Sequence, residues 1–111
     1  MLYNIFVNQL VLADTKLDLT DAAILYYLKV FCTSTNDLIE KERIRDDTGV
    51  WTWVDYNNLL YNLPILRIKT AGSLTPRIQR IQDEGFIESR REGNQKLFIK
   101  LNSKVDELFI N

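Results

Sequence analysis

The sequence predicts a small α+β protein whose helices are followed by a two-stranded antiparallel hairpin late in the chain. Three segments carry apolar residues at helical spacing, and several β-prone runs lie between and after them. At 111 residues, with 46% hydrophobic and 26% charged residues, the chain has the size and composition of one globular domain. We therefore expect residues 1–111 to form a single domain.

The clearest helical pattern covers about residues 70–84. Leu74, Ile78 and Ile81 recur at helical spacing, so they form one apolar stripe. Gly85 follows, and glycine adopts the left-handed conformation beyond a helix end at little cost. The pattern predicts an amphipathic helix that ends at this glycine.

One residue conflicts with a continuous helix over this segment. Pro76 removes a backbone hydrogen bond and favours a kink, unless the helix starts there with Thr75 as its cap. Both possibilities are compatible with the sequence.

A hairpin is expected directly after this helix. Residues 86–89 and 96–101 are strand-like runs, and the charged tip at 90–95 contains a glycine. Together they predict a two-stranded wing over about residues 86–101.

An earlier helix is expected over residues 20–32, with Thr20 as its N-cap and Asp21 where the helix dipole favours an acid. Most of this helix should be buried as scaffold. Its apolar residues are Ile24, Leu25, Leu28, Phe31 and Cys32.

A second hairpin is one of two interpretations of the polar segment that follows. Residues 41–45 and 50–54 would pair around a turn at 46–49. The alternative is a short helix over residues 37–43.

Two tryptophans fall in the second of these strands. At period-2 spacing Trp51 and Trp53 face the same side, where they either pack in the core or form a contact surface. Asp55 then caps a short helix at 56–63 that Pro64 terminates.

The two ends of the chain contain many apolar residues for small termini. Tyr3–Val7 is β-prone and predicts an edge strand or an extended arm. A short C-terminal tail is expected at 102–111, and its apolar part at 103–110 is a candidate dimer contact together with Tyr3–Val7. Two-fold symmetry would suit a palindromic or repeated DNA site.

The net charge of −1 conceals a segregation of charge along the chain. Residues 1–66 hold five basic and nine acidic side chains, whereas residues 67–104 hold nine basic and four acidic ones. The basic part coincides with the predicted amphipathic helix and wing. It is either a nucleic-acid-binding surface or an ordinary solvated surface of mixed charge.

Several function classes are disfavoured by composition. The chain has no histidine, so it lacks the commonest metal ligand and the usual general base; we expect no enzyme, no metal and no cofactor. Cys32 is the only cysteine, which excludes an intrachain disulfide and fits a reducing, cytoplasmic location. No apolar run approaches the length of a membrane span, and no signal peptide is recognisable.

The expected order is helix, strand, helix, turn, helix, strand, strand, which is the order of a winged helix-turn-helix fold with a three-helix core and a small antiparallel sheet. Over roughly residues 3–101 the chain resembles the N-terminal domain of phage and plasmid replication initiators and replisome organisers, the DnaD-like group. The motifs are WTWVDYNNLLYNLP at 51–64, QDEGFI at 82–87 and LDLTDAAIL at 17–25. The resemblance implies duplex DNA binding in replication initiation or transcription regulation, with the third helix in the major groove.

Ten polar residues are candidates for DNA contacts in that docking geometry. Arg77 and Arg80 are long enough to read guanine, and Gln79 could pair with adenine. Near the helix N-terminus, hydroxyl groups are suited to bonding phosphate, and the remaining cations would contact the DNA backbone and minor groove. The hydroxyl residues are Thr70, Ser73 and Thr75, and the remaining cations are Lys69, Arg90, Arg91 and Lys96.

A second hypothesis belongs to another functional class. The same scaffold could serve as a protein-interaction module without DNA binding, through the tryptophan strand or the acidic first half of the chain. Its partner would be a replication or transcription protein. Binding that does not depend on salt would distinguish this hypothesis from phosphate recognition.

Overall fold

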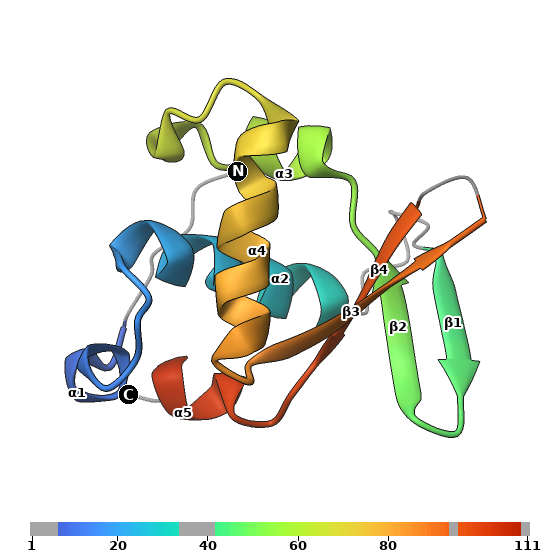
Figure 1. Cartoon of the computed structure of the whole chain (residues 1–111), viewed down its shortest axis with the longest axis horizontal. Helices are drawn as coiled ribbons and strands as arrows, with labels where there is room; N and C mark the ends of the chain where they lie inside the picture. The colour runs from blue at the N-terminus through green and yellow to red at the C-terminus, as the bar shows by residue number, and fades with distance from the viewer. Residues whose placement is uncertain (1–6, 34–41, 94–95, 110–111) are drawn as a thin grey trace.

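The computed structural model describes residues 7–33, 42–93 and 96–109. Within these ranges the chain is a mixed α+β protein, with helices gathered beside an antiparallel sheet (Figure 1). The α-helices are α1 (Gln9–Ala13), α2 (Leu19–Thr33), α3 (Tyr56–Asn62), α4 (Thr75–Asp83) and α5 (Val105–Phe109). Two 3₁₀ helices, η1 (Pro64–Leu66) and η2 (Ala71–Leu74), and the strands β1 (Arg43–Asp46), β2 (Gly49–Trp53), β3 (Ile87–Glu92) and β4 (Lys96–Leu101) complete the order.

The four strands form one sheet in the order β1-β2-β4-β3, with every neighbouring pair antiparallel. The predicted wing is the β3–β4 hairpin, and the predicted second hairpin is β1–β2, closed by the pair Asp46 and Gly49. Gly49 has a φ of 135°, which a side chain would strain. The short-helix alternative is wrong at Arg43, which lies in β1; residues 37–41 are outside the described ranges.

The sheet has two different faces because successive side chains alternate along each strand. One face packs on the helices through Val54, Ile99 and Leu97, which join the main core. The outer face carries Trp51 and Trp53, as their spacing predicted. Trp51 is only 7% exposed although it lies outside the main core cluster, so other side chains of the chain must cover it.

The first turn of α2 corrects one prediction. Thr20 lies inside the helix, and the cap is Asp18, whose Oδ1 accepts from the Asp21 backbone N–H at 2.8 Å. Asp21 Oδ2 in turn accepts from the Asp18 N–H at 3.2 Å. This reciprocal arrangement is a capping box with aspartate at both positions, and two backbone donors are satisfied by it.

The α3 prediction is confirmed. Asp55 Oδ1 accepts from the Asn57 backbone N–H at 2.9 Å, and the helix stops before Pro64, which starts η1. Leu59 and Leu63 are buried, whereas Tyr56 and Leu60 are partly buried. The apolar side of this short helix therefore faces the core.

The helix predicted over residues 70–84 is divided into η2 and α4. Pro76 lies in the first turn of α4, where its missing N–H removes no interior hydrogen bond. Leu74, Ile78 and Ile81 are buried as expected. Gly85 ends the segment at φ 85°, with its N–H bonded to Gln82 O at 2.9 Å. The structure is close to the second possibility left by the sequence, a helix that starts at the proline, but Thr75 is not its cap: α4 begins at Thr75, and its N-cap is Leu74, which makes no side-chain capping bond.

The C-terminal tail is part of the core over residues 105–109, which corrects the dimer contact predicted there. It forms α5, in which Val105, Leu108 and Phe109 are buried within the chain. Helix α1, which the sequence did not predict, packs against it, and the Asn8 N–H bonds Leu108 O at 2.8 Å. These tail side chains are therefore not available for a dimer contact. The predicted strand at Tyr3–Val7 falls almost wholly outside the described residues.

Replacing Leu108 by alanine tests the role of α5. Because Leu108 is 0% exposed, we expect Leu108→Ala to lower the free energy of unfolding by about 2–5 kcal/mol. Urea unfolding measures the change, and Leu10→Ala, at a site that is 80% exposed, is the matched control. If Leu108→Ala kept full stability but changed the oligomeric state, the intramolecular role would be wrong.

Candidate nucleic-acid interface

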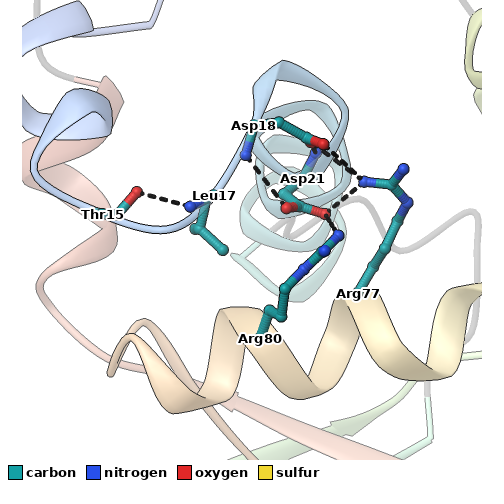
Figure 2. A network of polar contacts seen from close by, with 6 residues as sticks. All are labelled: Thr15, Leu17, Asp18, Asp21, Arg77 and Arg80. Atoms are coloured by element: carbon teal, nitrogen blue, oxygen red, sulfur yellow. Dashed lines mark hydrogen bonds and ion pairs between the residues drawn. The ribbon is translucent and has the colours of Figure 1, made fainter.

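Arg77 and Arg80, the two predicted guanine contacts, reach from α4 to the start of α2 (Figure 2). Arg77 Nη1 lies 2.9 Å from Asp21 Oδ1 and 3.1 Å from Asp18 Oδ1. Arg80 Nη2 lies 3.3 Å from Asp21 Oδ1. The Asp21 side chain is 1% exposed, so two cations surround a buried carboxylate. We call these four residues the Asp21 clamp.

The pKa shifts in the Asp21 clamp favour the ionised pairs. Burial alone would raise the pKa of Asp18, but the Asp21 N–H and the Arg77 guanidinium outweigh it, and that pKa lies below its ordinary value. The hydrogen bond to Asp21 raises the pKa of Arg77. The clamp thus holds α4 on α2 through charge. Arg80 remains the more accessible of the two arginines, with 46% of its side chain exposed against 26% for Arg77.

The predicted wing contacts Arg90 and Lys96 lie on the outer face of the sheet and are also paired. Arg90 Nη1 is 2.6 Å from Asp46 Oδ2 and Arg90 Nε is 3.0 Å from Glu92 Oε1. Lys96 Nζ is 2.7 Å from Glu42 Oε2. The charge of these two cations is therefore largely balanced within the chain.

These two cations and Lys100 cover the tryptophans. Arg90 Cζ lies 5.0 Å and Lys100 Nζ 5.4 Å from the Trp51 ring centroid, and Lys96 Nζ lies 4.8 Å from that of Trp53. The Trp51 indole N–H also donates to Thr48 Oγ1 at 3.0 Å. We call this covering of the outer sheet face the cation layer. It places Trp51 neither in the helical core nor on an open contact surface.

Asp46 connects the cation layer to the β1–β2 turn. Its carboxylate accepts from the Thr48 hydroxyl and backbone N–H and pairs with Arg90. Led by the Thr48 bonds, these contacts hold the pKa of Asp46 well below its ordinary value of 3.8. Asp46 therefore stays ionised in the native protein at pH values where it would be protonated in the unfolded chain.

The remaining candidates on the η2–α4 segment lie near the N-terminal end of α4. Lys69, Thr70, Ser73 and Thr75 are exposed, and the Thr70 and Ser73 hydroxyl oxygens are 2.8 Å apart. Farther along α4, Gln79 is exposed and donates to Asp83 Oδ1 at 2.9 Å. The exposed hydroxyl groups and the positive end of the helix dipole make this end suitable for an anion.

Arg67 precedes this segment in the chain and was not among the predicted contacts. It is exposed in the left-handed conformation at φ 55°, directly after η1. In the described parts of the chain neither Arg67 nor Lys69 forms an ion pair. The position of Arg67 in the basic half of the sequence indicated a candidate contact. The sequence did not show that its side chain would be exposed. We call Arg67, Lys69, Thr70, Ser73 and Thr75 the α4 entry surface.

The last predicted contact, Arg91, lies on the side of the wing that faces α3. Arg91 and Tyr56 line one small cavity, and the Thr75 side chain acts on the Tyr56 hydroxyl from the start of α4. Burial raises the pKa of Tyr56, although the positive charge of Arg91 and the Thr75 side chain oppose the rise. Arg91 is thus connected to the α4 entry surface through Tyr56, whereas Arg90 is directed to the opposite face.

Comparison of the chain with protein-family models, curated proteins and solved structures finds no match. The resemblance to the DnaD-like group therefore depends on the quoted motifs alone. Among the described residues, no helix is both long and apolar enough to cross a bilayer. Within the same ranges, no group of three or more His, Cys, Asp or Glu side chains is arranged to hold a metal ion.

Removing the buried carboxylate should destabilise the chain. We expect Asp21→Ala to lower the free energy of unfolding by about 2–3 kcal/mol, because it loses charged hydrogen bonds and half of the capping box. The cost is below that of a fully buried pair because both arginines remain partly solvated. Chemical denaturation measures it, with Asp83→Ala on the exposed side of α4 as the control. Equal stability of both variants would contradict the role of the clamp.

The lowered pKa of Asp46 predicts a pH dependence. A carboxylate whose pKa is depressed on folding stabilises the native state above its unfolded pKa of 3.8 and loses that effect as the pH falls below it. The urea midpoint of the wild type should therefore be higher than that of Asp46→Asn at neutral pH. The difference between the two midpoints should shrink between about pH 4 and pH 2. Asp47→Asn, at the adjacent exposed turn position, is the control. A constant difference across this range would show that Asp46 contributes no charge effect.

Proposed function

We propose that this chain is a winged-helix protein that binds duplex DNA with α4 in the major groove and the β3–β4 wing beside it. The order α2, β2, α3, α4, β3, β4 and the pairing of β4 with both β2 and β3 support this fold assignment. By the quoted resemblance, its role is in replication initiation or transcription regulation of phage or plasmid type. A homodimer on a two-fold-symmetric site, through a surface other than α5, belongs to the same proposal.

The observation that carries this proposal is the α4 entry surface. After ion pairs are assigned, Arg67 and Lys69 are exposed cations without a described acidic partner, and they lie beside three exposed hydroxyl groups. Phosphate contacts are made by side chains of these types and at this end of a recognition helix. The entry surface would position the DNA backbone, with Gln79 one turn farther along α4 facing the bases.

The contact set differs from the one expected from the sequence. The main role of Arg77 is to hold α4 in position, because it pairs with the carboxylates of Asp18 and Asp21 at the start of α2. Arg80 can still reach outward, since nearly half of its side chain is exposed. On the wing, Arg90 is held in the cation layer, so we do not assign it a main DNA contact. Arg91 is exposed and stays a candidate contact, although it too interacts within the chain. Lys96, paired with Glu42, is secondary for the same reason.

A double substitution tests the entry surface. Arg67→Ala/Lys69→Ala should weaken binding of a labelled random duplex and reduce the slope of log K against log salt by roughly 2, about one per lost phosphate contact. Fluorescence anisotropy at several salt concentrations measures both quantities. An Arg77/Arg80 double alanine variant is less informative, because it also dismantles the Asp21 clamp.

The matched control is Lys16→Ala/Arg45→Ala, which removes the same charge from exposed sites elsewhere. Lys16 lies near the C-terminal end of α4, where its backbone N–H bonds Glu84 Oε1 at 2.7 Å, and Arg45 lies on β1. This control should keep the wild-type affinity and slope. Absence of duplex binding at low salt, or equal loss in both variants, would overturn the proposal.

A protein-interaction module is the second candidate, and one observation favours it. Tyr61 and Ile65 are 83% and 79% exposed on consecutive turns of α3 and η1, which is unusual for large apolar side chains so close together. The tryptophan strand expected to serve this role is covered by the cation layer. A salt-independent affinity that is lost in Tyr61→Ala would support this candidate against DNA binding.

A further inference from the structure

Two large apolar side chains remain in solvent where α3 passes into η1. Tyr61 and Ile65 both keep most of their surface exposed. The core does not need them, because Leu59, Leu63 and Leu66 already occupy the inward side of this segment. Large apolar side chains that stay exposed this close together mark a contact surface.

Cations follow the exposed pair along the chain. Leu66 and Ile68 pack against the core, whereas Arg67 and Lys69 are exposed. Neither cation has an acidic partner in the described ranges. An aromatic ring, an aliphatic side chain and two unpaired positive charges therefore lie within nine residues of one another.

The segment around this surface is free of acidic residues. No aspartate or glutamate occurs between Asp55 and Asp83. On α3, Asn58 is exposed and precedes Tyr61 by three residues, so the two are neighbours on the helix surface. Its amide group can bond the edge of a base. A ring and an amide beside cations, without a carboxylate, suit a polyanion that carries bases better than a protein segment.

Single-stranded nucleic acid is held by these types of side chain. Its unpaired bases stack on aromatic rings, and its phosphates follow a basic path. We propose that Asn58, Tyr61, Ile65, Arg67 and Lys69, which we call the α3–η1 surface, bind unpaired nucleotides. One base stacks on the Tyr61 ring with the Asn58 amide at its edge and Ile65 beside it. Arg67 and Lys69 contact the phosphates.

The α3–η1 surface adjoins the α4 entry surface. Helix α3 contacts η2, which leads into α4, and Figure 1 shows α3 beside the N-terminal end of α4. A strand that leaves a duplex at the entry surface would therefore reach Tyr61, and the two cations would serve both sites. This path rests on the proposed function, whereas binding of a free single strand does not.

A labelled oligothymidylate tests the stacking contact. In fluorescence anisotropy with the full chain, Tyr61→Ala should weaken binding about fivefold or more, the loss expected for one stacked base. Tyr61→Phe should keep the affinity, because it keeps the ring. Leu10→Ala, at a comparably exposed apolar site on α1, is the matched control. No binding of oligothymidylate, or equal affinity of Tyr61→Ala and wild type, would overturn the inference.

A strand of the same length without bases separates stacking from charge. Wild type and Tyr61→Ala should bind this abasic strand equally. For oligothymidylate, Arg67→Ala/Lys69→Ala should reduce the slope of log K against log salt by about 1.4, since each phosphate contact on a single strand contributes about 0.7. Tyr61→Ala should leave that slope unchanged. A Tyr61→Ala defect of equal size on the abasic strand would exclude stacking and overturn the inference.

The two proposals fail in different ways. Duplex binding without oligothymidylate binding would remove the α3–η1 surface and leave the entry surface. Oligothymidylate binding that is lost in Tyr61→Ala, without salt-sensitive duplex binding, would remove the proposed function and leave the α3–η1 surface. If both hold, the wild type should prefer a duplex with a single-stranded arm over a fully paired one. Tyr61→Ala should abolish this preference and leave the affinity for the paired duplex unchanged.

Discussion

The buried carboxylate of Asp21 determines how the two main helices of this chain meet. It closes the first turn of α2 through its capping box and at the same time holds Arg77 and Arg80 of α4. A buried charge is tolerated only when such partners surround it, so the position of α4 is constrained by charge as well as by Ile78 and Ile81 in the core. Whatever α4 does at its exposed side depends on this attachment.

Ion pairing decides which of the basic residues remain available. The segregation of charge along the sequence suggested one continuous positive surface, but Arg77, Arg90 and Lys96 each have an acidic partner from the first half of the chain. In the described residues, acids of the first half therefore pair with four of the nine basic residues at 67–104, namely Arg77, Arg80, Arg90 and Lys96. The cations of the α4 entry surface form no ion pair in these residues, and this surface is a smaller and more localised feature than the sequence implied. The low net charge of the chain agrees with a basic surface of this small size.

Local signals in the sequence predicted the elements well. The cap at Asp55, the stop at Gly85 and the β1–β2 turn depend on residues within a few positions of one another. The missed ion pairs and the missed burial of α5 depend on contacts between distant parts of the chain, whereas the Thr20 cap was a local error, since Asp18 caps α2 instead. Asp21 and Arg77 are 56 residues apart, and the burial of α5 requires a core that only the folded chain assembles. Of the candidate site, the residue types were predictable, whereas their pairing and exposure were not.

The change of helix type at Leu74 and Thr75 has a geometric consequence for recognition. A 3₁₀ segment turns by about 120° per residue and an α-helix by about 100°, so side chains before and after the junction do not follow one angular sequence. Thr70 is the extended residue that precedes η2, and its hydroxyl lies 2.8 Å from that of Ser73 inside η2. Pro76 lies in the first turn of α4 and so determines where the 3₁₀ helix ends and the α-helix begins. The position of this junction determines the direction in which the Thr70 and Ser73 hydroxyls face relative to Gln79.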